Sequence, residues 1–167
     1  LVRVMVGKAG VPGHCVNGEW GPLREAVPVC NAATGEELAG MPITSADEVA
    51  AAVAAARKAQ PAWEASGGPA RARVLYAIAR LMQKHARLLS VMESLDNGKP
   101  IRESRDIDIP LAIRHFFHHA GHAQLMPTAL VDRVALGVLC HIIPWNFTPW
   151  MTAGQLDAPR AMMHTGP

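Results

Sequence analysis

The chain has 167 residues, the length of one ordinary domain, and half of them are hydrophobic. Its 16 basic and 14 acidic side chains leave a formal net charge of only +2, and the two kinds alternate along residues 102–106. This balance excludes the clustered positive charge of a nucleic-acid-binding surface. No apolar run is long enough to cross a membrane, so we expect no membrane association.

The three cysteines, Cys15, Cys30 and Cys140, are far apart and odd in number, and no CxxC pair is present. They therefore predict no disulfide framework, and a reducing, cytoplasmic environment suits them best. Residues 1–11 mix apolar residues with two basic ones and two glycines, unlike a signal peptide. Because the first residue is Leu1 and not Met, we expect the natural protein to start earlier.

The first structured region is expected to be extended. Residues 12–44 are rich in Gly, Pro and Asn with short apolar pieces. Residues 15–20 and 26–30 are typical of short strands, and residues 31–36 are typical of a turn after them.

A helix should follow. Ser45 and Glu48 have the spacing of a capping box, in which each side chain satisfies a free backbone N–H of the other residue. Pro61 should end this helix, because proline interrupts the hydrogen-bond pattern, and Trp63 should pack beyond it.

Two more helical stretches are expected. One begins at Pro69, a residue favoured in the first turn, and keeps helical apolar spacing up to Asn97-Gly98, a natural helix stop. The next starts near residues 108–110 and runs to about Gln124.

Residues 134–143 are continuously apolar and β-prone, and Pro144 ends the run. Such a run predicts a strand covered on both faces, as in a parallel sheet. Helices followed by a buried strand indicate an α/β protein.

Asn146 follows that strand in a loop. Ligands of open α/β sheets bind at the carboxyl ends of strands, where an amide N–H can stabilise a developing oxyanion. From the residues alone, a plain turn role is the more common one for an Asn after Pro-Trp.

The stretch Ile-Ile-Pro-Trp-Asn-Phe at residues 142–147 resembles the central signature of the aldehyde dehydrogenase superfamily. Other segments resemble that family in the same order. They are Asn-Gly-Glu-Trp at 17–20, the turn at 31–36, the helix at 47–63, Asn-Gly-Lys-Pro at 97–100 and residues 118–123.

The resemblance covers residues 14–147 and implies the N-terminal part of a Rossmann-like NAD(P)-binding domain with an incomplete sheet. Residues 1–13 match poorly. Residues 148–167 form a divergent tail that begins with Thr148 where the family normally has Pro. Residues 125–136 are too short for the family's usual subunit-pairing hairpin and resemble a class-16 type.

The resemblance implies NAD- or NADP-dependent oxidation of an aldehyde to a carboxylic acid. In that family a Cys thiolate forms a thiohemiacetal, hydride passes to the nicotinamide, and a Glu-activated water releases the acid. The position matching Asn146 supplies the oxyanion-stabilising amide. Positions matching Ile142, Ile143, Pro144 and Trp145 line the cofactor site, largely through backbone.

The family's nucleophilic Cys, general-base Glu and glycine-rich cofactor loop lie beyond the matched region, so this chain alone is expected to be inactive. The parent protein is expected to form a homo-oligomer. The alternative is a truncated or pseudoenzyme chain with a structural or association role. Because a strand at 134–143 lacks covering strands, we expect aggregation or a molten state.

Three other features of the sequence could indicate a different chemistry. Cys140 lies in the apolar run and is expected to be a buried, inert thiol. His115, His118, His119 and His122 share one helix face, but no further ligand accompanies them, so we predict stacking or solvent contact and no metal site. Lys99 is expected to be a loop residue and not a phosphate ligand.

Overall fold

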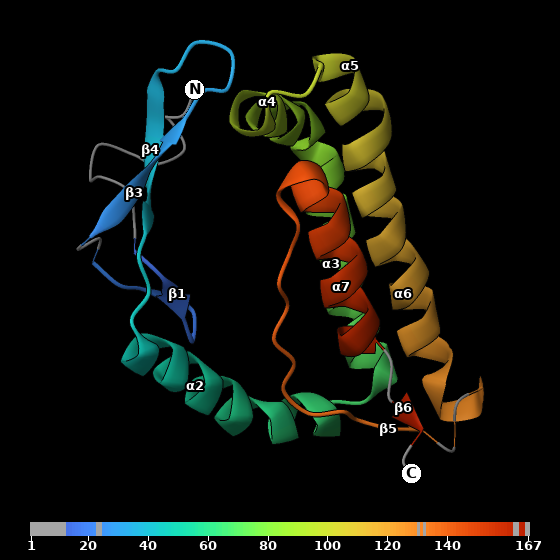
Figure 1. Ribbon diagram of the computed structural model, residues 1–167. Coiled ribbons are helices and arrows are strands. Elements are labelled where there is room, and N and C mark those ends of the chain that lie inside the picture. The colour runs from blue at the N-terminus through green and yellow to red at the C-terminus, as the bar shows by residue number, and fades with distance from the viewer. Residues whose placement is uncertain (1–12, 23–24, 130, 132, 162–163, 166–167) are drawn as a thin grey trace.

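The computed structural model describes residues 13–22, 25–129, 131, 133–161 and 164–165. The poorly matched segment 1–13 therefore lies almost wholly outside the described residues, as do Met162 and Met163 of the predicted tail. Figure 1 shows two β-hairpins and the long helix α2 on one side of the molecule, and a bundle of helices that contains α3, α6 and α7 on the other.

The first hairpin pairs β1 (Cys15–Val16) with β2 (Glu19–Trp20) in antiparallel orientation. The two residues between these strands, Asn17 and Gly18, have φ values of 54° and 82°. Both lie in the left-handed region, which a two-residue hairpin turn of this kind requires and which Asn-Gly adopts readily. The extended region expected at residues 15–20 is confirmed as this hairpin.

The second hairpin pairs β3 (Ala26–Cys30) with β4 (Glu37–Pro42), with a register shift between Val29 and Cys30. The predicted turn between them is confirmed. Asn31 Oδ1 accepts a hydrogen bond from the backbone N–H of Ala33 at 2.9 Å, which is an Asx-turn. The strand β4 was not predicted.

Helix α2 (Ala46–Ala65) begins as expected at the capping box. Ser45 Oγ accepts from the Glu48 N–H at 3.2 Å, and Glu48 Oε2 accepts from the Ser45 N–H at 2.8 Å. The predicted end near Pro61 is wrong, because α2 runs through Pro61 and contains Trp63. The helix is exposed around Pro61, so water can satisfy the carbonyl that proline leaves without a donor.

The long helical stretch predicted after Pro69 is two helices, α3 (Gly68–Lys84) and α4 (Ala86–Asn97), joined at His85. Pro69 lies in the first turn of α3, as predicted. Gly98 ends α4 with φ 80° and ψ 7°, the left-handed conformation that glycine adopts without strain.

The next helix, α6, starts at Ile109 as predicted and ends later than predicted, and a short helical region that was not predicted precedes it. A short helix α5 (Ile101–Glu103) continues into a π-helical turn η1 (Ser104–Asp108) and then into α6 (Ile109–Ala129). After the extended segment that follows, a single turn η2 (Trp145–Phe147) leads into α7 (Thr148–Ala161).

The core lies where α3, α6 and α7 pack together (Figure 1). Many of its side chains are alanines, which let helix backbones approach closely. Gly68 shows how closely, because a Cβ placed there would lie 2.1 Å from the Ala123 carbonyl oxygen. The buried residues of this core are Ala72, Leu75, Ala79, Ile109, Ala112, Ile113, Phe116, Ala120, Ala123 and Ala153.

The predicted buried strand at residues 134–143 is wrong. Only β5 (Arg133–Val134) pairs there, with β6 (His164–Thr165), and residues 135–144 pair with no strand in the described parts of the chain. Ile142 is 90% exposed. The apolar run needs partner strands to be buried, and each described sheet is a two-stranded antiparallel pair. Among the described residues, no helix is long and apolar enough to span a membrane.

Candidate functional site

The loop that carries Asn146 is fixed at its start and its end. Pro144 is extended, with φ −67° and ψ 147°, and the η2 turn follows directly. Thr148, the first residue of α7, turns back so that its Oγ1 donates a 3.0 Å hydrogen bond to the Trp145 carbonyl. Thr148, which stands where the family was expected to have Pro, therefore closes the turn through its hydroxyl.

A second hydrogen bond reaches the same carbonyl from a distant segment. Asn97 Nδ2, at the end of α4, donates to the Trp145 carbonyl oxygen at 2.7 Å. The left-handed Gly98 that ends α4 follows Asn97 immediately. The Asn-Gly-Lys-Pro segment and the Pro-Trp-Asn-Phe segment thus contact each other.

Lys99 reinforces this contact. Its Nζ lies 2.5 Å from Asp108 Oδ2, and the side chains are 13% and 2% exposed. The same Nζ lies 3.8 Å from the ring centroid of Phe147, which is within the range of a cation–π interaction. A buried carboxylate needs such a partner, and the η1 turn presents Asp108 to Lys99.

The residues predicted to form the site differ in exposure. Ile142, Pro144 and Trp145 are exposed, whereas Ile143 and Asn146 are half-buried. In the described part of the chain, the Asn146 amide makes no hydrogen bond, so its N–H groups are available to a ligand.

The structural roles of Asn97, Lys99 and Asp108 were not predicted from the sequence. The Asn-Gly-Lys-Pro segment was recognised, but Asn97 was interpreted only as a helix stop and Lys99 only as a loop residue. A polar residue that precedes a left-handed glycine is a usable signal, since such a position leaves its side chain free to reach another segment.

Cys140 is exposed, which corrects the prediction of a buried strand thiol. The physical reason is the one that exposes Ile142, namely that residues 135–144 have no covering strand among the described residues. Cys15 and Cys30 are also exposed and free.

The four histidines predicted to share a face of α6 do so, and their rings contact one another, with the rings of His115 and His119 stacked at 6.2 Å and the other pairs tilted or edge-on. The ring centroids of His118 and His122 are 4.4 Å apart, and those of His118 and His119 are 5.0 Å apart. Burial, followed by repulsion from His118 and His119, lowers the pKa of His122. His115 Nε2 accepts a 3.0 Å hydrogen bond from Trp150 Nε1, so the cluster also joins α6 to α7.

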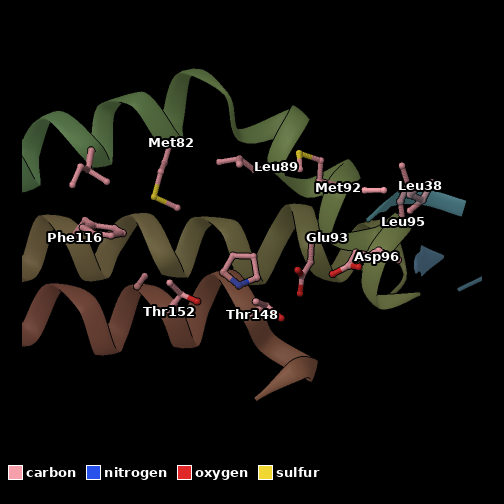
Figure 2. Close-up of a pocket in the computed structure, with 15 residues that line it drawn as sticks. Leu38, Met82, Leu89, Met92, Glu93, Leu95, Asp96, Phe116, Thr148 and Thr152 are labelled. Atoms are coloured by element: carbon pink, nitrogen blue, oxygen red, sulfur yellow. The ribbon is translucent and has the colours of Figure 1, made fainter. Parts of the chain in front are cut away.

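A pocket of about 490 Å³ lies between the β3–β4 hairpin and helices α3, α4, α6 and α7 (Figure 2). Its walls are mostly apolar and include Ile78, Met82, Leu89 and Phe116. The carboxyl group of Glu93 also lines it.

Helices together with small two-stranded sheets make this a mixed α/β protein, and the loop at Asn146 is its candidate ligand site. The aldehyde dehydrogenase family model matches residues 20–162 of the chain. The chain belongs to the aldehyde dehydrogenase family.

Curated relatives agree. The chain is 38% identical over 132 residues to a long-chain-aldehyde dehydrogenase of Acinetobacter sp, covering 73% of this chain and 26% of that protein. It is 37% identical over 133 residues to acetaldehyde dehydrogenase 2 of Cupriavidus necator, covering 74% of this chain and 26% of that protein. The chain thus spans about a quarter of the length of these two relatives.

Solved structures share the fold. An E. coli NADP dependent enzyme matches with a TM-score of 0.83 and 31% identity, over 90% of this chain and 34% of that one. An NAD+ complex of a Bacillus cereus aldehyde dehydrogenase matches with a TM-score of 0.79 and 29% identity, over 88% and 33%. The expected α/β class with an incomplete sheet is confirmed, whereas the class-16 subgroup stays a prediction.

Proposed function

We propose that the protein takes part in the NAD- or NADP-dependent oxidation of an aldehyde to a carboxylic acid, with Asn146 as the oxyanion-stabilising residue. The observation that supports this proposal is that two hydrogen bonds fix the loop before Asn146. The Trp145 carbonyl accepts hydrogen bonds from both Asn97 and Thr148, while the adjacent Asn146 amide makes none in the described structure.

The chemical role of Asn146 follows from the charge that develops during the reaction. When a nucleophile adds to the aldehyde carbon, the carbonyl oxygen becomes negative. An amide N–H that is already oriented stabilises this oxygen without reorganisation, and the loss of one such donor typically costs about 2.7–4 kcal/mol of transition-state stabilisation. The hydrogen bonds to the Trp145 carbonyl fix the backbone from which the Asn146 amide extends.

Ile142, Ile143, Pro144 and Trp145 are proposed to line the cofactor site, largely through their backbone. Ile142, Ile143 and Pro144 fit this role because residues 135–144 make no ladder hydrogen bonds in the described chain, which leaves their carbonyl groups available. The nicotinamide cofactor, when bound, accepts the two electrons that leave the aldehyde as hydride.

We propose that this chain alone does not turn over aldehyde. Reactive thiols need a nearby base or cation to form the thiolate. Cys15, Cys30 and Cys140 are free and exposed, and none of their thiols makes a hydrogen bond or ion pair in the described structure. The activity belongs to a larger protein, which we propose is cytoplasmic and homo-oligomeric.

A chimaera tests this function. Residues 20–147 replace the matching segment of the Acinetobacter long-chain-aldehyde dehydrogenase, and NADH fluorescence is followed with a panel of aldehydes. We expect turnover by the folded chimaera and none by the 167-residue chain. A folded chimaera that binds NAD+ but oxidises no aldehyde would contradict the proposal, and turnover by the pure chain would contradict its inactivity.

The exposed apolar side chains of Leu136, Leu139, Ile142 and Trp145 favour a second candidate, a role in association only. Sedimentation of the chain tests it. A chimaera without activity together with a chain that forms a defined oligomer would favour this second role.

A further inference from the structure

The pocket between the β3–β4 hairpin and the helices contains a buried acid without a partner. Glu93 is 4% exposed, and its Oε1 has no hydrogen-bond partner among the described residues. Figure 2 shows its carboxyl group pointing from α4 toward Thr148 at the start of α7. A buried polar atom left unsatisfied destabilises the fold, so this arrangement favours a ligand that supplies the missing donor.

The charges around Glu93 indicate what kind of donor fits. Burial raises the pKa of Glu93, Lys99 lowers it, and Asp108 and Asp96 raise it further. Lys99 is already paired with Asp108, whereas Asp96 lines the same pocket as Glu93. This end of the pocket therefore carries two carboxyl groups and no cation of its own, so a positively charged donor fits better than a neutral one.

The rest of the pocket determines the body of the ligand. Its volume of about 490 Å³ lies in the range of small-molecule sites, and its walls are apolar side chains such as Met82, Leu89 and Phe116. An unbranched hydrocarbon chain would bury apolar surface against these walls and gain about 0.8 kcal/mol per buried CH₂.

We propose that this pocket binds a medium-chain primary amine as its ammonium ion. The ammonium group donates to Glu93 Oε1, and the alkyl chain lies against Met82, Leu89 and Phe116. This pocket adjoins the loop at Asn146 through Thr148, but the proposal does not depend on the proposed aldehyde oxidation.

Titration calorimetry with octylamine, octanol and octanoate, each below its aggregation limit, tests the proposal. We expect octylamine to bind about tenfold or more tightly than octanol, because a hydrogen bond to a charged group is worth about 1.5–3 kcal/mol. Octanoate should bind more weakly than octanol. Equal binding of amine and alcohol, or no binding of the amine, would overturn the proposal.

Glu93→Gln is the matched variant, since it keeps the shape and removes the charge. It should lose the preference for octylamine and keep the affinity for octanol. Glu64→Gln, which changes an exposed acid of α2, is the control and should bind like the unaltered chain. Unchanged octylamine binding by a folded Glu93→Gln variant would overturn the proposal.

If Glu93→Gln does not fold, a measurement on the unaltered chain tests whether the amine binds in this pocket. Octylamine should shift the methyl NMR signals of Met82 and Met92, which line the pocket, and leave that of Met126 in place. Met126 is buried elsewhere, against Arg71. Shifts of all three signals, or of none, would contradict binding in this pocket.

Discussion

The side-chain amide of Asn97 donates a 2.7 Å hydrogen bond to the main-chain carbonyl of Trp145, 48 residues further along the chain. The bond joins the end of α4 to the η2 turn and so positions the loop that presents Asn146. Two of the segments that carry the family resemblance are therefore parts of one structural unit.

Asn97→Ala should destabilise the chain by about 1 kcal/mol, the usual net contribution of one hydrogen bond. Urea denaturation followed by circular dichroism measures the change. Asn146→Ala is the matched control. Because the Asn146 amide has no partner in the described structure, this substitution should change the free energy of unfolding little. Equal losses for both variants would show that the Asn97 bond does not hold the loop.

Lys99→Met should lower the free energy of unfolding by a larger amount, about 3–5 kcal/mol, because it leaves the buried Asp108 carboxylate without a counter-ion. The control is Arg105→Gln. Arg105 pairs with Asp106 at 2.6 Å on the surface, where solvent screens the interaction, and its removal should cause no measurable loss. Thermal melts of the two variants should thus differ clearly, and a Lys99→Met variant as stable as Arg105→Gln would refute the interpretation.

Gly68→Ala should destabilise the packing of α3 on α6 by about 1–3 kcal/mol, since the added Cβ would meet the Ala123 carbonyl oxygen and force the helices apart. Gly121→Ala is a suitable comparison, because a Cβ there meets only Tyr76 Oη, at 3.9 Å. Chemical denaturation of both variants tests this, and a Gly68→Ala variant of unaltered stability would mean that the helices are not so close.

The local elements were predictable because short-range chemistry determines them. Ser45 with Glu48, and Gly98 after Asn97, start and end helices through contacts within one turn. The exposure of residues 135–144 was not predictable, because an apolar run signals a need for burial and cannot show whether a partner strand is present. The Lys99–Asp108 pair also escaped prediction, since a spacing of nine residues matches no single helix face and depends on the η1 turn.

Glu93 should make stability depend on pH. Its pKa is raised above the ordinary value of 4.5, so the folded state binds the proton more tightly than the unfolded state does. The resulting stabilisation is fully present below that ordinary value and is lost as pH rises through the raised pKa. Glu93→Gln should be more stable than the unaltered chain by about 1 kcal/mol at pH 8 and not at pH 4, as measured by urea unfolding. A difference that does not vary with pH would contradict this.

His122 should make stability depend on pH in the opposite direction to Glu93. Burial and the neighbouring His118 and His119 lower its pKa below the ordinary 6.5, so the unfolded state binds the proton more tightly. The contribution of His122 to stability should be fully present above pH 6.5 and should be lost as the pH falls through the lowered pKa. His122→Gln should flatten this dependence, and His85→Gln, at the exposed junction of α3 and α4, should not. Melting temperatures measured across this pH range test the difference.

Single-turnover kinetics of the chimaera that carries Asn146→Ala test whether Asn146 stabilises an oxyanion. We predict that the chemical step slows by about 10²–10³-fold while NAD+ binding and folding are retained, as for the loss of one oxyanion donor. A folded Asn146→Ala chimaera that oxidises aldehyde at the unaltered rate would contradict the claim.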